Sequence, residues 1–308
     1  PNAADGMGAF AAGKGKVALV RNHELDMRYP FFGPFTDKVA DDFRCYDRVV
    51  DKDGKAGQPV FGGTTTLIYD LKTGQTEAEY LSLSGTIRNC AGGITPWGSW
   101  LTCEETVTRA GQGVGKDHGY IFEVPSAHKG LVDPVPLKAM GRFNHEAACV
   151  DPRTGIVYLT EDRDDGLLYR FLPNVKGDLS KGGRLEALAI DGVADSRNWN
   201  GLNMPLRAGT SARWIALDNP ESPDDDLRKR GSKAGATLFA RGEGMWWSKG
   251  TQAQGGHFYF TCTSGGAKKA GQVFRYTPDA MPASGSGNPM NIIELFYESA
   301  DLAYFNPY

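Results

Sequence analysis

Short runs of alternating hydrophobic and polar residues dominate the chain, with Gly- or Pro-containing turns between them. Three pairs of runs follow one order: strand, polar turn, Gly, strand and Pro. They lie at 100–105 with 119–125, at 158–163 with 166–173, and at 259–263 with 271–278. Alternation with a period of two predicts β-strands whose two faces differ in polarity. The recurrence predicts copies of one antiparallel unit.

Each unit has a further short strand on either side. The preceding strands are expected at 90–97, 146–152 and 243–248, and the following ones at 136–140, 184–190 and 291–297. Four antiparallel strands that recur around an axis are typical of the blades of a β-propeller. An N-terminal unit at 16–24, 64–70 and 76–83 fits less completely.

We therefore predict an all-β fold, a β-propeller that occupies residues 1–308 as a single domain. Four blades are clear from the pattern. Residues 195–242 are expected to form either a further blade or a long insertion, because periodicity does not decide between the two. The composition agrees with a fold of many tight turns, since 40 Gly and 17 Pro stand among 308 residues.

Charge and hydropathy narrow the classes of partner. The net charge is -3, and without a Lys/Arg run it argues against nucleic acid binding. No apolar stretch approaches the roughly 18 residues of a transmembrane helix, so no membrane span is predicted. The five cysteines include no Cys-x-x-Cys pair, which argues against a disulfide scaffold and against a tetrathiolate metal site. No export signal is visible at Pro1, as expected either of a cytoplasmic protein or of a processed one.

Acidic residues gather where the predicted strands meet one face of the propeller. The first strand of a blade runs along the axis and the second returns, so the start of one lies beside the end of the other. Cys90, Glu146 and Glu243 begin first strands. The residues that end second strands are Glu24, Glu104, Glu105, Glu161 and Asp162. All are expected to converge on one mouth.

Several carboxylates in one place repel one another, and an unpaired buried charge costs several kcal/mol. Such a cluster is expected to hold multivalent cations. Carboxylate oxygens suit calcium, whereas a thiolate suits a softer metal such as iron or zinc. The pattern therefore predicts a metal centre in the axial mouth.

Some of these residues have a second interpretation. Cys90 lies in a turn of small residues, where a cysteine is either a ligand or a buried hydrophobic side chain. Glu104 and Glu105 are adjacent, so at most one is expected to point into the channel. His23 and His145 each precede a glutamate, and we favour a role in tying loops to backbone carbonyls over metal binding.

Six motifs in order resemble the PhoX alkaline phosphatases, from about residue 17 to the end of the chain. They are Asn22-His-Glu24, Gly62-Gly-Thr-Thr-Thr-Leu67, Asn89-Cys-Ala-Gly-Gly-Ile-Thr-Pro-Trp-Gly98 with Trp100-Leu-Thr-Cys-Glu-Glu105, Arg142-Phe-Asn-His-Glu-Ala147, Leu159-Thr-Glu-Asp-Arg163 and Ala240-Arg-Gly-Glu-Gly-Met-Trp-Trp247. The resemblance implies a six-bladed propeller, of which this chain has the last blade incomplete. It also implies hydrolysis of phosphate monoesters by an axial cluster of Ca²⁺ and Fe³⁺.

The resemblance also assigns residues. Cys90 is similar to the iron-ligating thiolate, and Arg241 to the catalytic residue that binds the substrate phosphate. Arg241 and Glu243 share a strand face, which would place the guanidinium beside the metals. The predicted metal ligands are Cys90, Glu24, Glu146, Glu243, Asp162 and one or other of Glu104 and Glu105.

Members of this family are usually exported in folded form, which implies a periplasmic or secreted monomer that acts on small phosphate esters. Two other functions stay open. A calcium-dependent propeller lactonase also uses one carboxylate from each of several blades, but it needs no thiolate. A non-enzymatic binding propeller would use calcium only to stiffen the mouth.

Overall fold

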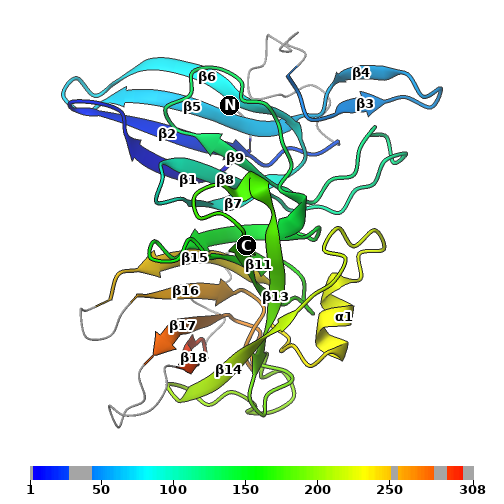
Figure 1. Ribbon diagram of the computed structural model, residues 1–308, viewed down its shortest axis with the longest axis vertical. Coiled ribbons are helices and arrows are strands. Elements are labelled where there is room, and N and C mark those ends of the chain that lie inside the picture. The colour runs from blue at the N-terminus through cyan, green and yellow to red at the C-terminus, as the bar shows by residue number, and fades with distance from the viewer. Residues whose placement is uncertain (1–2, 28–43, 251–255, 281–289, 301–308) are drawn as a thin grey trace.

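The computed structural model describes residues 3–27, 44–250, 256–280 and 290–300. Strands dominate these residues, and their one α-helix is the short α1 (Leu227–Lys233) (Figure 1). The predicted all-β class is confirmed. None of the described helices is long and apolar enough to cross a bilayer.

The strands form four antiparallel blades. The first has the order β1-β2-β5-β6, with β1 (Ala4–Ala11), β2 (Lys16–His23), β5 (Gly62–Asp70) and β6 (Gln75–Thr86). The second consists of β7 (Asn89–Ile94), β8 (Ser99–Glu104) and β9 (Ile121–Pro125). The third consists of β10 (His145–Val150), β11 (Val157–Glu161), β12 (Leu168–Pro173) and β13 (Gly183–Ile190). The fourth consists of β15 (Gly242–Ser248), β16 (His257–Cys262), β17 (Gln272–Ala280) and β18 (Met290–Glu298).

Two details differ from the strands expected. The first blade begins with β1, which the sequence pattern missed. The strand expected at 136–140 was wrong, because residues Lys138–Met140 form the 3₁₀ helix η1. Pro134 and Pro136 explain the difference, since proline has no N–H to give to a β-ladder.

The innermost strands of the four blades pack around an axis in the order β1, β7, β10, β15. Their backbones approach closely where glycine allows it. A Cβ on Gly93 of β7 would lie 2.0 Å from the carbonyl oxygen of Ala148 in β10, and one on Gly6 would lie 2.8 Å from Cα of Ala91. This arrangement is that of a β-propeller, as predicted.

Residues 195–242 supply α1 and one strand, β14 (Gly209–Ala216). This strand pairs with β13 on one side and β18 on the other, so the outer edges of the third and fourth blades join in one nine-stranded sheet. An edge strand with unpaired N–H and C=O groups invites pairing with other chains. β14 therefore covers two such edges at once. A short hairpin of β3 (Arg48–Val50) and β4 (Ala56–Pro59) lies outside the blades.

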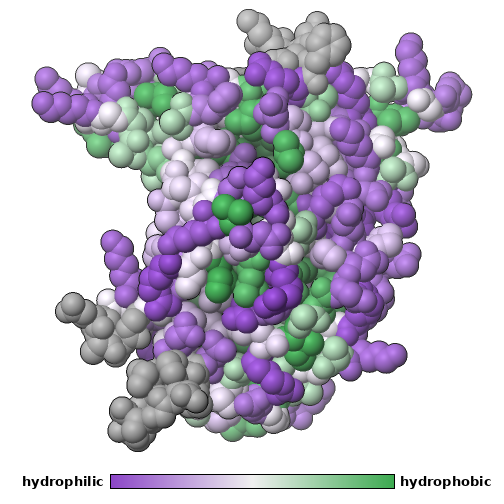
Figure 2. All heavy atoms as spheres, in the orientation of Figure 1, coloured by the Kyte–Doolittle hydropathy of each residue, from purple (hydrophilic) through white to green (hydrophobic). Residues whose placement is uncertain are grey.

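Hydrophobic cores fill the interfaces between neighbouring blades. Phe10, Val20, Leu83, Trp100 and Phe122 pack between the first and second blades. A larger cluster of the same kind joins the second and third, and an aromatic-rich one joins the third and fourth. Hydrophilic residues cover most of the face drawn in Figure 2, with hydrophobic ones in small patches. The facing sides of neighbouring blades are thus buried against one another, which holds the strand ends at the mouth in fixed positions.

Candidate metal centre

The second residue of each innermost strand carries a carboxylate or a thiol. These residues are Asp5 in β1, Cys90 in β7, Glu146 in β10 and Glu243 in β15. In all four blades the pairing with the neighbouring strand is irregular just there, between residues 4 and 7, 89 and 92, 145 and 148, and 242 and 245. Such bulges redirect a side chain. The same local irregularity therefore recurs at the equivalent position of every blade, and in three of the four blades that position holds a predicted ligand.

A second set of polar residues follows the end of each second strand. These residues are Glu24 after β2, Glu105 after β8, Asp162 after β11 and Thr263 after β16. In each blade the N–H of this residue donates to the carbonyl just before the innermost strand. The acceptors are Ala3, Arg88, Asn144 and Arg241, at 2.8, 2.9, 3.1 and 3.0 Å respectively. One repeated backbone bond thus fixes both sets at the same rim.

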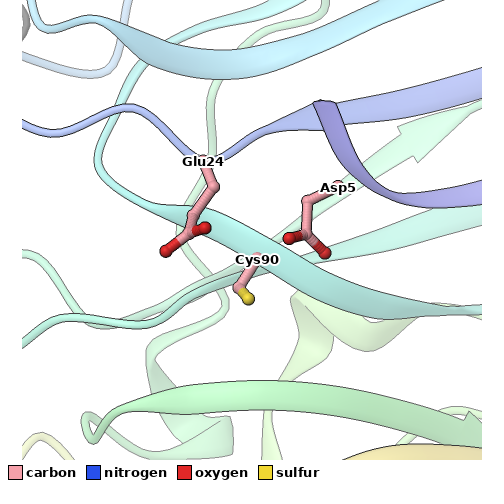
Figure 3. Close-up of side chains that lie close together, drawn as sticks. All are labelled: Asp5, Glu24 and Cys90. Carbon is pink, nitrogen blue, oxygen red and sulfur yellow. The ribbon is translucent and has the colours of Figure 1, made fainter. Parts of the chain in front are cut away.

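Two groups of potential ligands meet at Cys90. Asp5, Glu24 and Cys90 have ligand atoms that all lie within 4.8 Å of one another (Figure 3). Cys90, Glu105 and Glu146 form a second group by the same measure. The structure therefore brings three of the predicted carboxylate ligands, Glu24, Glu105 and Glu146, together around the predicted thiol ligand Cys90. Asp5 was not predicted, although its position in an alternating run before the turn at 12–15 is the signal that could have found it.

The acidic groups in this mouth disfavour one another's ionisation. Burial raises the pKa of Glu146 to about 9, and the nearby Glu243 adds to the shift. Burial also raises the pKa of Glu105 to about 7, against the opposing charge of Arg88. The pKa of the Cys90 thiol is raised by burial and then by the charge of Glu146. Without a cation, these groups cannot all ionise together.

One buried atom tests whether the residues fit a metal. Glu146 is 3% exposed, and its Oε2 has no hydrogen-bond partner among the described residues. A buried carboxylate oxygen without a partner is costly unless a cation neutralises it. The donor set of one thiol and several carboxylates therefore fits bound cations, with a soft metal at Cys90 and hard ones at the oxygens.

Two arginines occupy the same position in two blades. Arg88 and Arg241 each precede an innermost strand, with φ of 50° and 55°. Non-glycine residues in this left-handed region are uncommon and are enriched at functional sites. Arg88 had not been predicted, although Arg88-Asn-Cys90 and Arg241-Gly-Glu243 share a spacing that reveals it.

Each of these arginines joins carboxylates of two blades. The Arg88 Nη2 donates to Glu24 at 3.2 Å and to Glu105 at 2.6 Å. Arg241 forms a two-pronged pair with Asp162, at 2.8 Å for both contacts, and donates to Glu243 at 3.0 Å. The mouth therefore holds two guanidinium groups that are already oriented at its rim.

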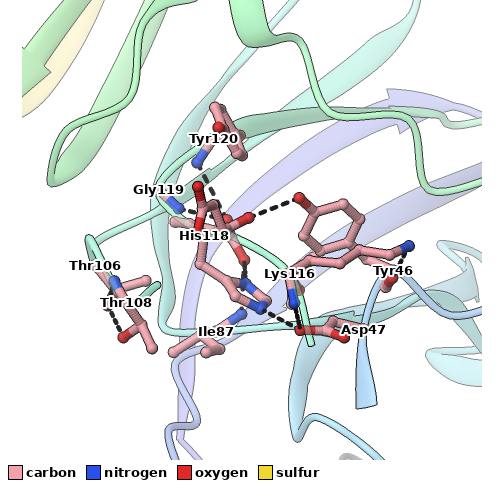
Figure 4. A network of polar contacts seen from close by, with 12 residues as sticks. Tyr46, Asp47, Ile87, Thr106, Thr108, Lys116, His118, Gly119 and Tyr120 are labelled. Atoms are coloured by element: carbon pink, nitrogen blue, oxygen red, sulfur yellow. Dashed lines mark hydrogen bonds and ion pairs between the residues drawn. The ribbon is translucent and has the colours of Figure 1, made fainter. Parts of the chain in front are cut away.

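Glu104 lies elsewhere, in a buried network on the far side of its strand. Figure 4 shows its partners Ile87, His118, Gly119 and Tyr120. Its Oε1 contacts His118 Nδ1 at 2.7 Å and accepts from the N–H of Ile87 at 2.9 Å. Its Oε2 accepts from the N–H groups of Gly119 and Tyr120. Glu104 belongs to neither group of potential ligands. Successive residues of a strand face opposite sides, so Glu105 is the one of the pair that lies at the mouth.

Glu161 and the two histidines are likewise turned inward. Glu161 Oε2 accepts a hydrogen bond from the Tyr169 hydroxyl at 2.7 Å. His145 Nε2 lies 3.0 Å from the Gly141 carbonyl, and burial lowers the pKa of this histidine to about 3. His23 Nε2 lies 2.9 Å from the Thr65 hydroxyl. His145 thus ties a loop to a backbone carbonyl, and neither histidine belongs to a group of potential ligands among the described residues.

His118 is expected to make stability fall at alkaline pH. It lies between Glu104 and Asp47, 3.2 Å from the latter. Burial alone would lower its pKa, but the charge of Glu104 and the bond to Asp47 outweigh it and raise the pKa to about 9 from 6.5. The resulting stabilisation, on the order of 3 kcal/mol, is complete below about pH 6.5 and is lost as pH rises through about 9.

Urea unfolding of the wild type and of His118→Gln at several pH values measures this effect. The free energy of unfolding should be lower in the variant near pH 6, and the difference should shrink toward about pH 10. A difference that stays constant across this range would show that the imidazolium charge does not stabilise the fold.

Comparisons with known proteins bear on this site. A family model described as "Alkaline phosphatase PhoX" matches residues 49–301. The structure of Pseudomonas fluorescens PhoX in complex with vanadate, a transition state analogue, aligns with a TM-score of 0.60 and 18% identity. That alignment covers 95% of this chain and 66% of that chain. This chain thus spans slightly less than two thirds of the length of the PhoX structure.

Two other solved structures are more distant. A glucose dehydrogenase aligns with a TM-score of 0.41 and 12% identity, over 96% of this chain and 84% of that one. A putative 6-phosphogluconolactonase from Bacteroides uniformis aligns with a TM-score of 0.33 and 10% identity, over 92% and 80%. A search of curated proteins finds no significant match.

Proposed function

The chain belongs to the PhoX alkaline phosphatase family, as its six motifs indicated, and on this premise we propose that it hydrolyses phosphate monoesters at the axial mouth. The observation that carries the proposal is the convergence of Cys90 with carboxylates from different blades. The partnerless buried oxygen of Glu146 at the same place supports it. These groups can hold cations, and the two rim arginines can hold an anion.

We assign the cations by the chemistry of their donors. Iron would bind at the Cys90 thiolate, and calcium at the carboxylates of Asp5, Glu24, Glu105 and Glu146. Glu243 and Asp162 are proposed as further ligands, because they flank the same rim and are held there by Arg241. When bound, such cations stabilise negative charge on phosphoryl oxygens. Glu104 is left out, since its carboxylate is engaged on the opposite side of β8.

The arginines bind and orient the phosphoryl group. Arg241 presents a guanidinium that is partly exposed and fixed by Asp162. A guanidinium pairs with phosphate through parallel, charge-assisted hydrogen bonds. Arg88 holds the equivalent place in the second blade, so the two cationic groups flank the mouth. Preorganised donors of this kind stabilise charge that develops during phosphoryl transfer.

Three features remain predictions. The six-bladed ring, export to the periplasm or medium, and a monomeric state follow from the family resemblance. The lactonase alternative is less favoured, because the thiol of Cys90 is shared by both groups of potential ligands and a lactonase needs none.

Elemental analysis combined with two assays tests the proposal. The purified protein is expected to contain both iron and calcium, to hydrolyse an aryl phosphate, and to lose that activity on treatment with a chelator. Calcium without iron, together with hydrolysis of a lactone, would instead indicate the lactonase. A protein that binds metal but turns over neither compound would indicate a binding module.

A further inference from the structure

A cavity opens beside the candidate metal centre, between the first and second blades. It measures about 500 Å³, and Arg88 forms part of its wall. The other lining residues come from the segments that follow Glu24 and Glu105 and from Ile87. Since Arg88 also contacts Glu24 and Glu105, one side chain borders both the cavity and the mouth. A group attached to a phosphate in the mouth could therefore extend into this space.

Hydrogen bonds cross the corresponding place between the third and fourth blades. There Asp164, two residues after Asp162, accepts a hydrogen bond from the hydroxyl of Ser264 at 2.8 Å. Arg197 also donates to the Asp164 carbonyl, at 3.1 Å. The equivalent residues of the first two blades are Asp26 and Thr106, and both line the cavity instead. The open side of the mouth is thus a specific difference between blades that otherwise repeat.

The lining of the cavity is polar on one part and apolar on another. The hydroxyls of Thr106 and Thr108 lie 2.8 Å apart (Figure 4). The side-chain oxygen of Gln112 accepts a hydrogen bond from the N–H of Arg109, so the NH₂ group of Gln112 is the donor that this side chain can offer to a ligand. Met27 and Ile87 add an apolar surface. Hydroxyls and an amide can bind the hydroxyl groups of a ligand, while apolar side chains contact its carbon skeleton.

Size and charge narrow the ligand further. The volume lies within the roughly 300–1,000 Å³ of small-molecule sites. Arg88 is the one cationic side chain among the lining residues that the structure describes, and it is already paired with Glu24 and Glu105. The described lining therefore offers no further cation to a ligand part that carries additional phosphates. The cavity therefore suits an uncharged group with several hydroxyls.

We propose that this cavity is the leaving-group subsite and that it selects monoesters of uncharged polyhydroxylated alcohols, such as glycerol or a sugar. The proposal rests on the proposed phosphatase function. Thr108 and Gln112 are its specificity-determining residues, and Arg88 separates them from the phosphoryl group.

Binding of non-hydrolysable phosphonates tests the subsite without requiring turnover. The probes are 3,4-dihydroxybutylphosphonate, which resembles glycerol phosphate, and butylphosphonate, which has the same carbon chain without hydroxyls. Calorimetry on the metal-loaded protein is expected to give about tenfold tighter binding of the dihydroxy compound, the equivalent of one or two net hydrogen bonds. Equal affinities, or no binding of either compound, would overturn the proposal.

Two variants assign the preference to the cavity. In Thr108→Val and in Gln112→Ala, the ratio of the two affinities is expected to fall to about twofold or threefold. Gln112 is exposed, so its replacement carries little risk to folding. Thr210→Val, on the distant strand β14, serves as the matched control and should keep the wild-type ratio.

Unchanged ratios in both cavity variants would refute the assignment. This test is independent of the proposed function. A protein that prefers the dihydroxy compound but does not hydrolyse glycerol phosphate would support the proposed subsite and refute the proposed phosphatase activity.

Discussion

Replacing Cys90 with alanine is expected to remove iron and phosphatase activity together. Cys90 is the residue shared by the two groups of potential ligands, so its loss affects both. Activity should fall by more than about a hundredfold, since even changes to groups that only support a metal ligand cost roughly 10- to 100-fold. Elemental analysis and an aryl phosphate assay on the same preparation measure the two effects.

Cys45→Ser is the matched control for this substitution. Cys45 is also a free, partly exposed cysteine, but it lies outside both groups of potential ligands. This variant is expected to keep the wild-type content of iron and calcium and the wild-type rate. A Cys90→Ala protein that remains active and loaded with iron would refute the proposed ligand.

Replacing Glu146 with glutamine is expected to stabilise the fold of the metal-free protein and to lower the activity of the metal-loaded protein. The folded-state pKa of Glu146 is about 9, against 4.5 for an unperturbed glutamate. A raised pKa of an acid means that folding disfavours its ionised form. The resulting loss in the free energy of unfolding is absent below about pH 4.5, grows as pH rises, and reaches its limit above about pH 9. Near pH 7 it is on the order of 3 kcal/mol.

In chelator-treated protein, Glu146→Gln should therefore raise the free energy of unfolding at neutral pH, by an amount that disappears toward about pH 4.5. With metals present, the same change should lower activity by about a hundredfold or more, because an amide is a weaker ligand for a cation than a carboxylate. Urea unfolding at several pH values measures the change in stability, and the phosphatase assay measures the change in activity.

Glu161→Gln gives a matched comparison, since Glu161 is also buried and burial raises its pKa to about 7. Its carboxylate accepts from Tyr169 in the core instead of facing the mouth. This variant is expected to show a smaller effect on stability and no change in metal content. Equal losses of metal in both variants would mean that Glu146 has no special role as a ligand.

The strands, the turns and the chemical character of the mouth could be read from the sequence. Alternation with a period of two is a local property, and Gly and Pro mark the turns through their own backbone geometry. Because the unit repeats, the residues at its strand ends could be assigned to one face before any contact was known. Cys90, Glu146 and Glu243 were placed at the mouth on this ground, and the structure has them at equivalent positions.

The side of the strand on which each carboxylate lies could not be read in this way. Glu104 and Glu105 have the same chemistry, and their alternation excludes only that both point into the channel. The choice depends on the register with β7 and on the buried partner His118, which lies 14 residues further along the chain, beyond the end of β8. The bulges that redirect Asp5 and Cys90 likewise arise where two strands pair, not within either one.

The chain itself therefore determined the repeated strands and which residue types reach the mouth, because both depend on local pattern. The direction of each side chain depended on pairing between segments far apart, as did the joining of two blades through β14 and the cavity beside Arg88. Such contacts form only when the blades pack together, since each is a relation between surfaces that no single segment contains.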